Sequence, residues 1–142
     1  MIDLDNQSNL TIEMIAIEKI ASSLSSKEIE LIITDDNTMQ SLNYEHRGQD
    51  HSTDVLSFPL ESPFIGQDML GSIIISASFV TKKANLLGHS IQDEFSLLFI
   101  HGMLHLLGFD HETDSGEMRQ KEKEIIEAFD LPKSLIVRTE EY

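Results

Sequence analysis

The first 44 residues alternate between segments with strand-like and helix-like spacing of apolar side chains. Residues 2–5 (IDLD) alternate apolar and acidic positions, which predicts a short strand, and apolar residues over 10–21 recur at the spacing of one helix face. The β-branched segment 27–34 (KEIELIIT) predicts a second strand. The polar residues 35–38 can cap a helix that reaches about Tyr44. We therefore expect strand, helix, strand and helix in this order.

The next part of the chain predicts two more strands and a short helix. A strand over 55–58 ends before Pro59, and the apolar segment 71–77 (GSIIISA) predicts a strand at the centre of a sheet. The residues between these strands include Ser, Pro and Gly, which is typical of a loop. A helix after Ser78 should end at Gly88, because glycine readily adopts the left-handed conformation of a helix C-cap.

The last part of the chain predicts one buried and one exposed helix. Ser90 can cap a helix that is apolar nearly all round and ends at Gly108, so we expect this helix to be buried. After a loop over 109–116, an acidic helix should extend to about Phe129. Its charged residues are expected on the outside, among them Glu122, Lys123 and Glu124.

The composition restricts the fold and the kinds of metal ligand. A chain of 142 residues with 40% hydrophobic and 25% charged residues is typical of one globular domain, here 1–142. There is no cysteine, so a transition metal would have to bind histidines or carboxylates. The first residues, MIDLDNQSNL, lack the basic and apolar regions of a signal peptide, and no apolar run is long enough to span a membrane. We therefore expect a cytoplasmic protein without a membrane partner.

The net charge of −15 disfavours a nucleic-acid partner, because a polyanion repels an acidic surface. The excess is concentrated toward the two ends of the chain. Segment 37–90 has 3 basic and 5 acidic residues and contains Arg47, Lys82 and Lys83. If RNA binds, we expect it at this segment, weakly and with a steep dependence on salt.

Three histidines in the segment FIHGMLHLLGFDHE have the spacing of a metal site. His101 and His105 are four residues apart, so on a helix their imidazoles lie on one face and can bind one ion. Gly108 allows the chain to reverse and bring His111 toward them. Three imidazoles with an open fourth position predict one catalytic zinc ion per chain. The alternative is two hydrogen-bonded histidines in a buried helix and a third in a loop, which is less favourable because buried imidazoles need partners.

The same spacing occurs in zinc peptidases of the metzincin type, in which a glutamate directly follows the first histidine and acts as general base. Here that position is Gly102, which cannot accept a proton. A peptidase would need a carboxylate from elsewhere, such as Asp110 or Glu112. The sequence therefore disfavours peptide hydrolysis.

Two segments together resemble the YbeY family of bacterial endoribonucleases that mature ribosomal RNA. HGMLHLLGFDH is similar to the HGxLHLxGxDH signature of that family, and LNYEHRGQDHSTDVLSFP, from Leu42 to Pro59, is similar to a second segment that ends in T-(D/N)-V-L-S-F-P. The order, separation and overall length also agree. One position departs from the family: Ser72 stands where an acidic residue is expected.

The resemblance implies an α+β fold with a small mixed sheet packed with helices, and a single-strand-specific endoribonuclease that acts in ribosomal RNA maturation and ribosome quality control. It assigns the metal ligands to His101, His105 and His111, and catalytic roles to Arg47 and the ligand His101. The implied partners are single-stranded RNA and the ribosome or its proteins, with no DNA expected.

The roles of the surrounding residues follow from their chemistry. Arg47 could bind a phosphate through its two-pronged guanidinium, or be an ordinary surface residue. Asp110 could orient a ligand imidazole, or cap its own turn. Ser57, Phe58 and Pro59 could form an exposed strand edge, with Phe58 stacking on a base or lying in the core. A non-enzymatic ribosome-assembly factor with a structural metal remains a third hypothesis, beside the nuclease and the peptidase.

Overall fold

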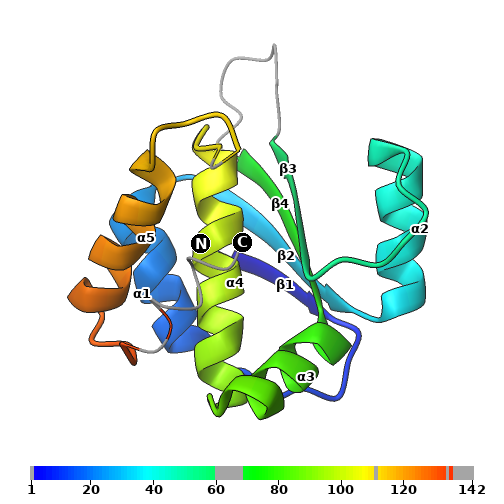
Figure 1. Ribbon diagram of the computed structural model, residues 1–142, viewed down its shortest axis with the longest axis horizontal. Coiled ribbons are helices and arrows are strands. Elements are labelled where there is room, and N and C mark those ends of the chain that lie inside the picture. The colour runs from blue at the N-terminus through cyan, green and yellow to red at the C-terminus, as the bar shows by residue number, and fades with distance from the viewer. Residues whose placement is uncertain (1, 60–68, 111, 134, 136–142) are drawn as a thin grey trace.

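A mixed sheet with helices on both faces makes up the fold (Figure 1). The computed structural model describes residues 2–59, 69–110, 112–133 and 135. The strands are β1 (Ile2–Asn6), β2 (Glu28–Thr34), β3 (Val55–Pro59) and β4 (Met69–Ser76). The helices are α1 (Met14–Leu24), α2 (Asp36–Arg47), α3 (Ala77–Leu87), α4 (Ile91–Leu106) and α5 (Glu117–Ala128).

The four strands lie in the order β1-β2-β4-β3. β1, β2 and β4 are parallel, and β3 pairs antiparallel with β4 at the edge. Parallel neighbours need a crossover, which α1 supplies between β1 and β2. Ile73 and Ile75 of β4 are completely buried, as expected for a central strand. The mixed sheet and its helices confirm the predicted α+β fold.

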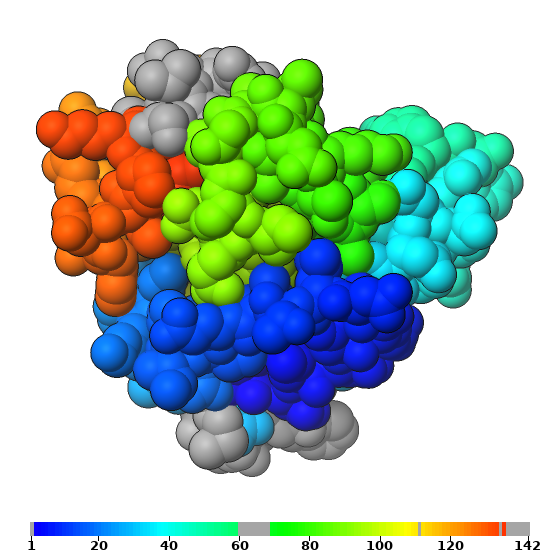
Figure 2. Space-filling view, turned by 90° about the horizontal axis from the view of Figure 1, so that it is seen from below, coloured from blue at the N-terminus to red at the C-terminus, as the bar shows by residue number. Residues whose placement is uncertain are grey.

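Helices of different sizes cover the two faces of the sheet (Figure 1). On one face, α1, α4 and α5 enclose the main core, in which Phe95 and Phe99 of α4 lie against the alternate strand residues of β2 and β4. On the other face, α2 contributes Met39 to a small cluster with Leu56 and Ile74. Figure 2 shows that α2 projects from one side of the molecule, away from α5 on the opposite side.

Three predicted features differ from the structure. α1 begins at Met14, because the residues from Leu10 are extended and the Leu10 carbonyl accepts a hydrogen bond from the Asn6 side chain. α2 continues to Arg47, where Gly48 ends it in the left-handed conformation (φ 69°). Glu122 was predicted on the outside of the last helix, but it is 1% exposed and points into the core side of α5.

The buried helix α4 is the element that positions the candidate site. The Ser90 hydroxyl accepts a hydrogen bond from the Asp93 N–H and caps its first turn, as predicted. Twelve of its 16 residues are buried, which agrees with its nearly uniform apolar sequence. Among the described helices, this one included, none combines the length and apolar character needed to cross a lipid bilayer.

Candidate active site

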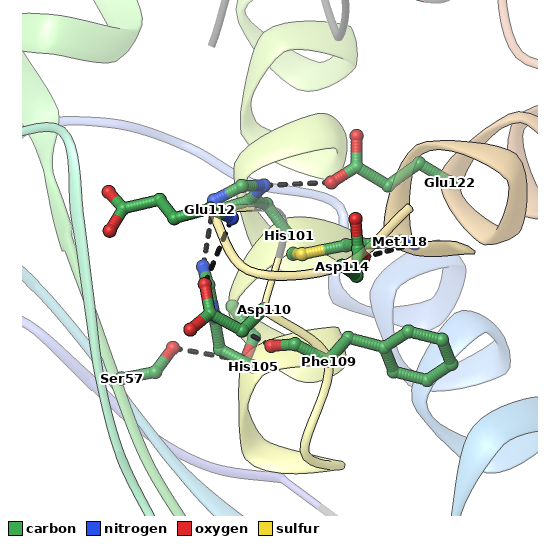
Figure 3. Close-up of polar contacts among 10 residues, drawn as sticks. Ser57, His101, His105, Phe109, Asp110, Glu112, Asp114, Met118 and Glu122 are labelled. Carbon is green, nitrogen blue, oxygen red and sulfur yellow. Dashed lines mark hydrogen bonds and ion pairs between the residues drawn. The ribbon is translucent and has the colours of Figure 1, made fainter. Parts of the chain in front are cut away.

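His101 and His105 lie one turn apart at the C-terminal end of α4 (Figure 3). Their Nε2 atoms face each other at 3.1 Å, and their rings meet edge to face with centroids 4.6 Å apart. This is the arrangement that the four-residue spacing predicts. Two imidazole nitrogens therefore converge on one point beside the helix.

The other nitrogen of each ring contacts an oxygen. His101 Nδ1 lies 2.7 Å from Glu122 Oε1, and His105 Nδ1 lies 3.0 Å from the Phe109 carbonyl oxygen (Figure 3). Since both oxygens are acceptors, each Nδ1 carries the hydrogen and donates it. Each neutral ring then presents the lone pair of Nε2.

Two lone pairs at this separation repel unless a cation lies between them. Zinc bound tetrahedrally at about 2.0–2.1 Å from each nitrogen would hold two ligands about 3.3 Å apart. The observed separation of 3.1 Å and the fixed tautomers therefore fit a zinc-like ion. His101 and His105 can hold such an ion, and a further ligand would have to come from the chain beyond α4.

The chain reverses directly after α4, as Gly108 predicted. Gly108 has a φ of 98°, and the Phe109 N–H donates to the Leu104 carbonyl. His111, the third predicted ligand, lies outside the described residues. Within the described part of the chain, no three His, Cys, Asp or Glu side chains are grouped closely enough for a metal. The three-histidine set therefore stays a prediction.

Asp110 caps its own turn, which was one of the two roles considered for it. Its Oδ1 accepts a hydrogen bond from the Glu112 N–H at 3.0 Å. The acceptors that orient the two imidazoles are instead Glu122 and the Phe109 carbonyl. The sequence contained a signal for Glu122, because it lies four residues after Met118 and three before Ile125, in the middle of the apolar face of α5.

Gly102 lies where α4 packs tightly against the sheet. Its carbonyl accepts a hydrogen bond from the Ser57 hydroxyl at 3.0 Å. A Cβ atom at this position would lie 2.9 Å from Ile73 Cγ2 and 3.2 Å from Ser57 Oγ. The glycine is thus required by packing, and there is no space for the glutamate that a metzincin peptidase has at this position.

Arg47 is exposed and is the last residue of α2, which extends three residues beyond the predicted end near Tyr44. Its end of α2 and the histidine end of α4 lie at the same end of the sheet but on opposite faces (Figure 1). The Arg47 side chain makes no hydrogen bond or ion pair with any residue that the structure describes. Arg47 is therefore not in direct contact with the histidines.

The edge strand β3 lies between these two groups. On one face, Ser57 contacts Gly102, and on the other the Phe58 ring lies 4.7 Å from the ring of His46. Phe58 is half-buried against the small α2 cluster. β3 is an edge strand, as predicted, and it links the Arg47 end of α2 to the histidines of α4.

Two further predictions concern residues away from the histidines. Lys82 and Lys83 belong to α3, which lies at the opposite end of the sheet from the histidine end of α4, because α3 follows the far end of β4 (Figure 1). They therefore do not flank the site. Ser72 donates a hydrogen bond to Glu30 Oε1 at 2.8 Å, so the carboxylate near this position comes from β2.

Comparisons with known proteins identify the family of the chain. The family model described as endoribonuclease YbeY matches residues 2–130. The chain belongs to the YbeY endoribonuclease family. Relatives named endoribonuclease YbeY are 60% identical in Sulfurovum sp., covering 99% of this chain and 98% of the relative, and 58% identical in Wolinella succinogenes, covering 99% of both. Family membership confirms the predicted endoribonuclease activity, and with it an RNA substrate.

A solved structure supports the fold. The solution structure of TM1509 from Thermotoga maritima is similar to this chain with a TM-score of 0.61 and 27% identity. The similarity covers 91% of this chain and 89% of that one. The arrangement of strands and helices described above is therefore shared over nearly the whole chain.

Proposed function

We propose that this YbeY-family protein is a zinc-dependent endoribonuclease that cleaves single-stranded RNA in ribosomal RNA maturation, at the 3′ end of the small-subunit RNA, and in ribosome quality control. The observation that carries the metal dependence is the pair of Nε2 atoms 3.1 Å apart, each on a ring whose Nδ1 is held by an oxygen. We place this activity in the cytoplasm, with the ribosome or its proteins as partner.

In this proposal His101, His105 and His111 hold one zinc ion. Zinc bound by three neutral imidazoles supplies Lewis-acid chemistry for phosphodiester hydrolysis. His101 and His105 supply two nitrogens in fixed tautomers, and the buried contacts of α4 keep them in place. The protein's contribution is thus a preformed pair of ligands on a rigid helix.

Arg47 is proposed to bind a phosphate of the RNA. Its guanidinium is always charged and can form two parallel hydrogen bonds to phosphate oxygens. Because Arg47 makes no ion pair with the described carboxylates, it is available to a substrate that crosses the edge strand β3 toward the histidines. The net charge of −15 provides little other attraction for RNA, so cleavage should weaken sharply as salt is added.

A cleavage assay on defined RNA tests this function. Wild-type protein with and without a chelator is incubated with a single-stranded RNA, with the same RNA in a duplex, and with casein. We expect cleavage of the single strand alone, lost with chelator and restored by zinc. Casein digestion that disappears in His101→Ala would support a peptidase, and metal binding without cleavage of any RNA would support the assembly-factor hypothesis.

A further inference from the structure

Glu122 is a buried carboxylate within an apolar helix face. It lies on α5, and only 1% of its side chain is exposed. Its neighbours on the same face are Met118, Ile125 and Ile126, all buried. Burying a carboxylate among apolar side chains is unfavourable unless it has a strong partner. The stability of α5 alone therefore gives no reason for a glutamate here.

The partner of Glu122 is a predicted metal ligand. Oε1 lies 2.7 Å from His101 Nδ1, and the His101 side chain is itself only 7% exposed. Oε2 is buried and has no hydrogen-bond partner among the described residues. The interactions of this carboxylate are thus concentrated on one imidazole, on the side away from His105 (Figure 3).

We propose that Glu122 is a positioning residue of the metal site, which holds His101 in the tautomer and ring orientation that present Nε2 to the ion. The inference rests on the metal site of the proposed function. His105 receives the same support from a backbone carbonyl, that of Phe109, which no substitution removes. Among the described residues, Glu122 is therefore the side chain through which the orientation of a ligand can be changed.

A charged carboxylate at this position should strengthen metal binding more than an uncharged hydrogen-bond acceptor would. Its negative charge makes the imidazole a stronger electron donor to a cation on the opposite nitrogen, and loss of such a partner typically lowers metal affinity 10- to 100-fold. The cation in turn compensates the negative charge of Glu122, which the apolar side chains around it on α5 cannot do. The structure thus links the packing of α5 on α4 to occupancy of the metal site.

The experiment compares two substitutions of similar size. Glu122→Leu removes the acceptor and the charge but keeps an apolar side chain in an apolar environment, and Glu122→Gln keeps an acceptor oxygen without the charge. Zinc affinity is measured by competition with a chromophoric chelator, and unfolding of the metal-free proteins by heat. Glu94→Gln is the matched control, because Glu94 is also a fully buried carboxylate but lies seven residues before His101 in α4.

We expect Glu122→Leu to lower zinc affinity 10- to 100-fold while the metal-free protein unfolds at the wild-type temperature or above it. Glu122→Gln should show a smaller but measurable loss of about three- to tenfold, because its amide oxygen can still accept from Nδ1 but carries no charge. Glu94→Gln should bind zinc as wild type does. A purely structural role would instead lower the unfolding temperature of Glu122→Leu and leave affinity unchanged.

Four results would overturn the inference. Wild-type affinity in both Glu122 variants would do so alone, as would an equal loss of affinity in Glu94→Gln. If Glu122→Leu does not fold, Glu122→Gln decides, and unchanged affinity in it then counts against the inference. Wild-type protein that binds no zinc would overturn the proposed metal site together with this inference, which keeps the two failures distinguishable.

Discussion

The two faces of the sheet differ in how firmly they hold their functional side chains. On the α4 face, His101 and His105 are each held by a hydrogen bond from Nδ1, to Glu122 and to the Phe109 carbonyl, and by a helix buried on most of its surface. On the α2 face, Arg47 is exposed at a helix end and has no partner among the described residues. The histidines are thus held by contacts within the protein, whereas the Arg47 side chain is held by no described residue.

This difference agrees with what each side binds in the proposed function. A metal needs nitrogens at fixed distances, which rigid packing supplies. A phosphate on a flexible RNA can be met by a long side chain that adapts. Substitution of His101 or His105 should therefore change metal content together with activity, whereas substitution of Arg47 should change activity alone.

The largest effect is expected for His105→Ala. The substitution removes a metal ligand, so zinc affinity should fall more than about 100-fold, which exceeds the loss expected when only a hydrogen-bond partner of a ligand is removed. RNA cleavage should fall to background. Metal content by elemental analysis and cleavage rate are measured on the same sample. His51→Ala, in an exposed loop, is the control. Zinc uptake equal to wild type in His105→Ala would refute the metal site.

Arg47→Glu should lose most of the RNA cleavage, about 100-fold or more, while metal content and unfolding temperature stay near wild type. The substitution replaces a phosphate-binding cation with a repelling charge at an exposed position. Arg47→Lys should be intermediate, because it keeps the charge but not the paired hydrogen bonds. Rates are compared at matched zinc occupancy. Cleavage by Arg47→Glu at the wild-type rate would reduce Arg47 to an ordinary surface residue.

Gly102→Ala should destabilise the protein by about 1–3 kcal/mol, as expected for an added methyl group in a packed core. In an exposed helix the same change would stabilise by up to about 1 kcal/mol. The opposite sign is expected here because the new Cβ would lie 2.9 Å from Ile73 Cγ2. Urea unfolding measures the change. A more stable variant would mean that α4 moves away from the sheet at little cost, contrary to its proposed rigidity.

The smallest effect concerns Asp36 at the start of α2. A hydrogen bond from the Ser78 hydroxyl, and a weaker contribution from Ser76, hold the pKa of Asp36 below its ordinary value of 3.8, against the opposing effect of burial. A lowered pKa in the folded state contributes stability above pH 3.8 that is lost as the pH falls through the lowered value. Asp36→Asn should therefore be less stable by about 1 kcal/mol at pH 7.

The pH series provides the test of this assignment. The stability difference between wild type and Asp36→Asn should shrink as the pH falls from 3.8 through the lowered pKa of Asp36, because the carboxyl is protonated first in the unfolded protein and then in the folded one. Urea unfolding at pH 7 and pH 3 measures it. A difference that grows on acidification would mean that the hydrogen bonds to Asp36 do not favour its charged form. Zinc content should be the same in both proteins, since Asp36 lies on the α2 face.

Much of the fold followed from local patterns in the sequence. The strand 71–77 is predicted to be central because it is largely apolar, and β4 is indeed an inner strand whose Ile73 and Ile75 are completely buried. Ser90 and Gly88 marked helix ends correctly, since caps depend on a few adjacent residues. The start of the first helix was wrong, because apolar residues after Leu10 are half-buried in an extended segment and imitate a helix face.

The part of the candidate site that depends only on residue spacing within one helix could be predicted from the sequence. His101 and His105 meet because four residues make one helical turn. Glu122 was misplaced because a charged residue in an acidic helix is expected to be exposed, and its partner is 21 residues away. The separation of Lys82 and Lys83 from the histidines depends on the direction of β4, which composition does not reveal. The burial of Glu122 and the position of the two lysines therefore depend on tertiary contacts, which local sequence patterns do not reveal.

The burial of α4 has a consequence for exchange kinetics. Backbone amides around Phe99 and Met103 lie in completely buried turns, so their hydrogens should exchange with solvent only when the whole protein unfolds. His101 lies within this buried backbone, whereas His105 lies in the last turn of α4 and is only half-buried. An ion held at the proposed site should therefore be released first by His105, while His101 keeps its position until the protein unfolds.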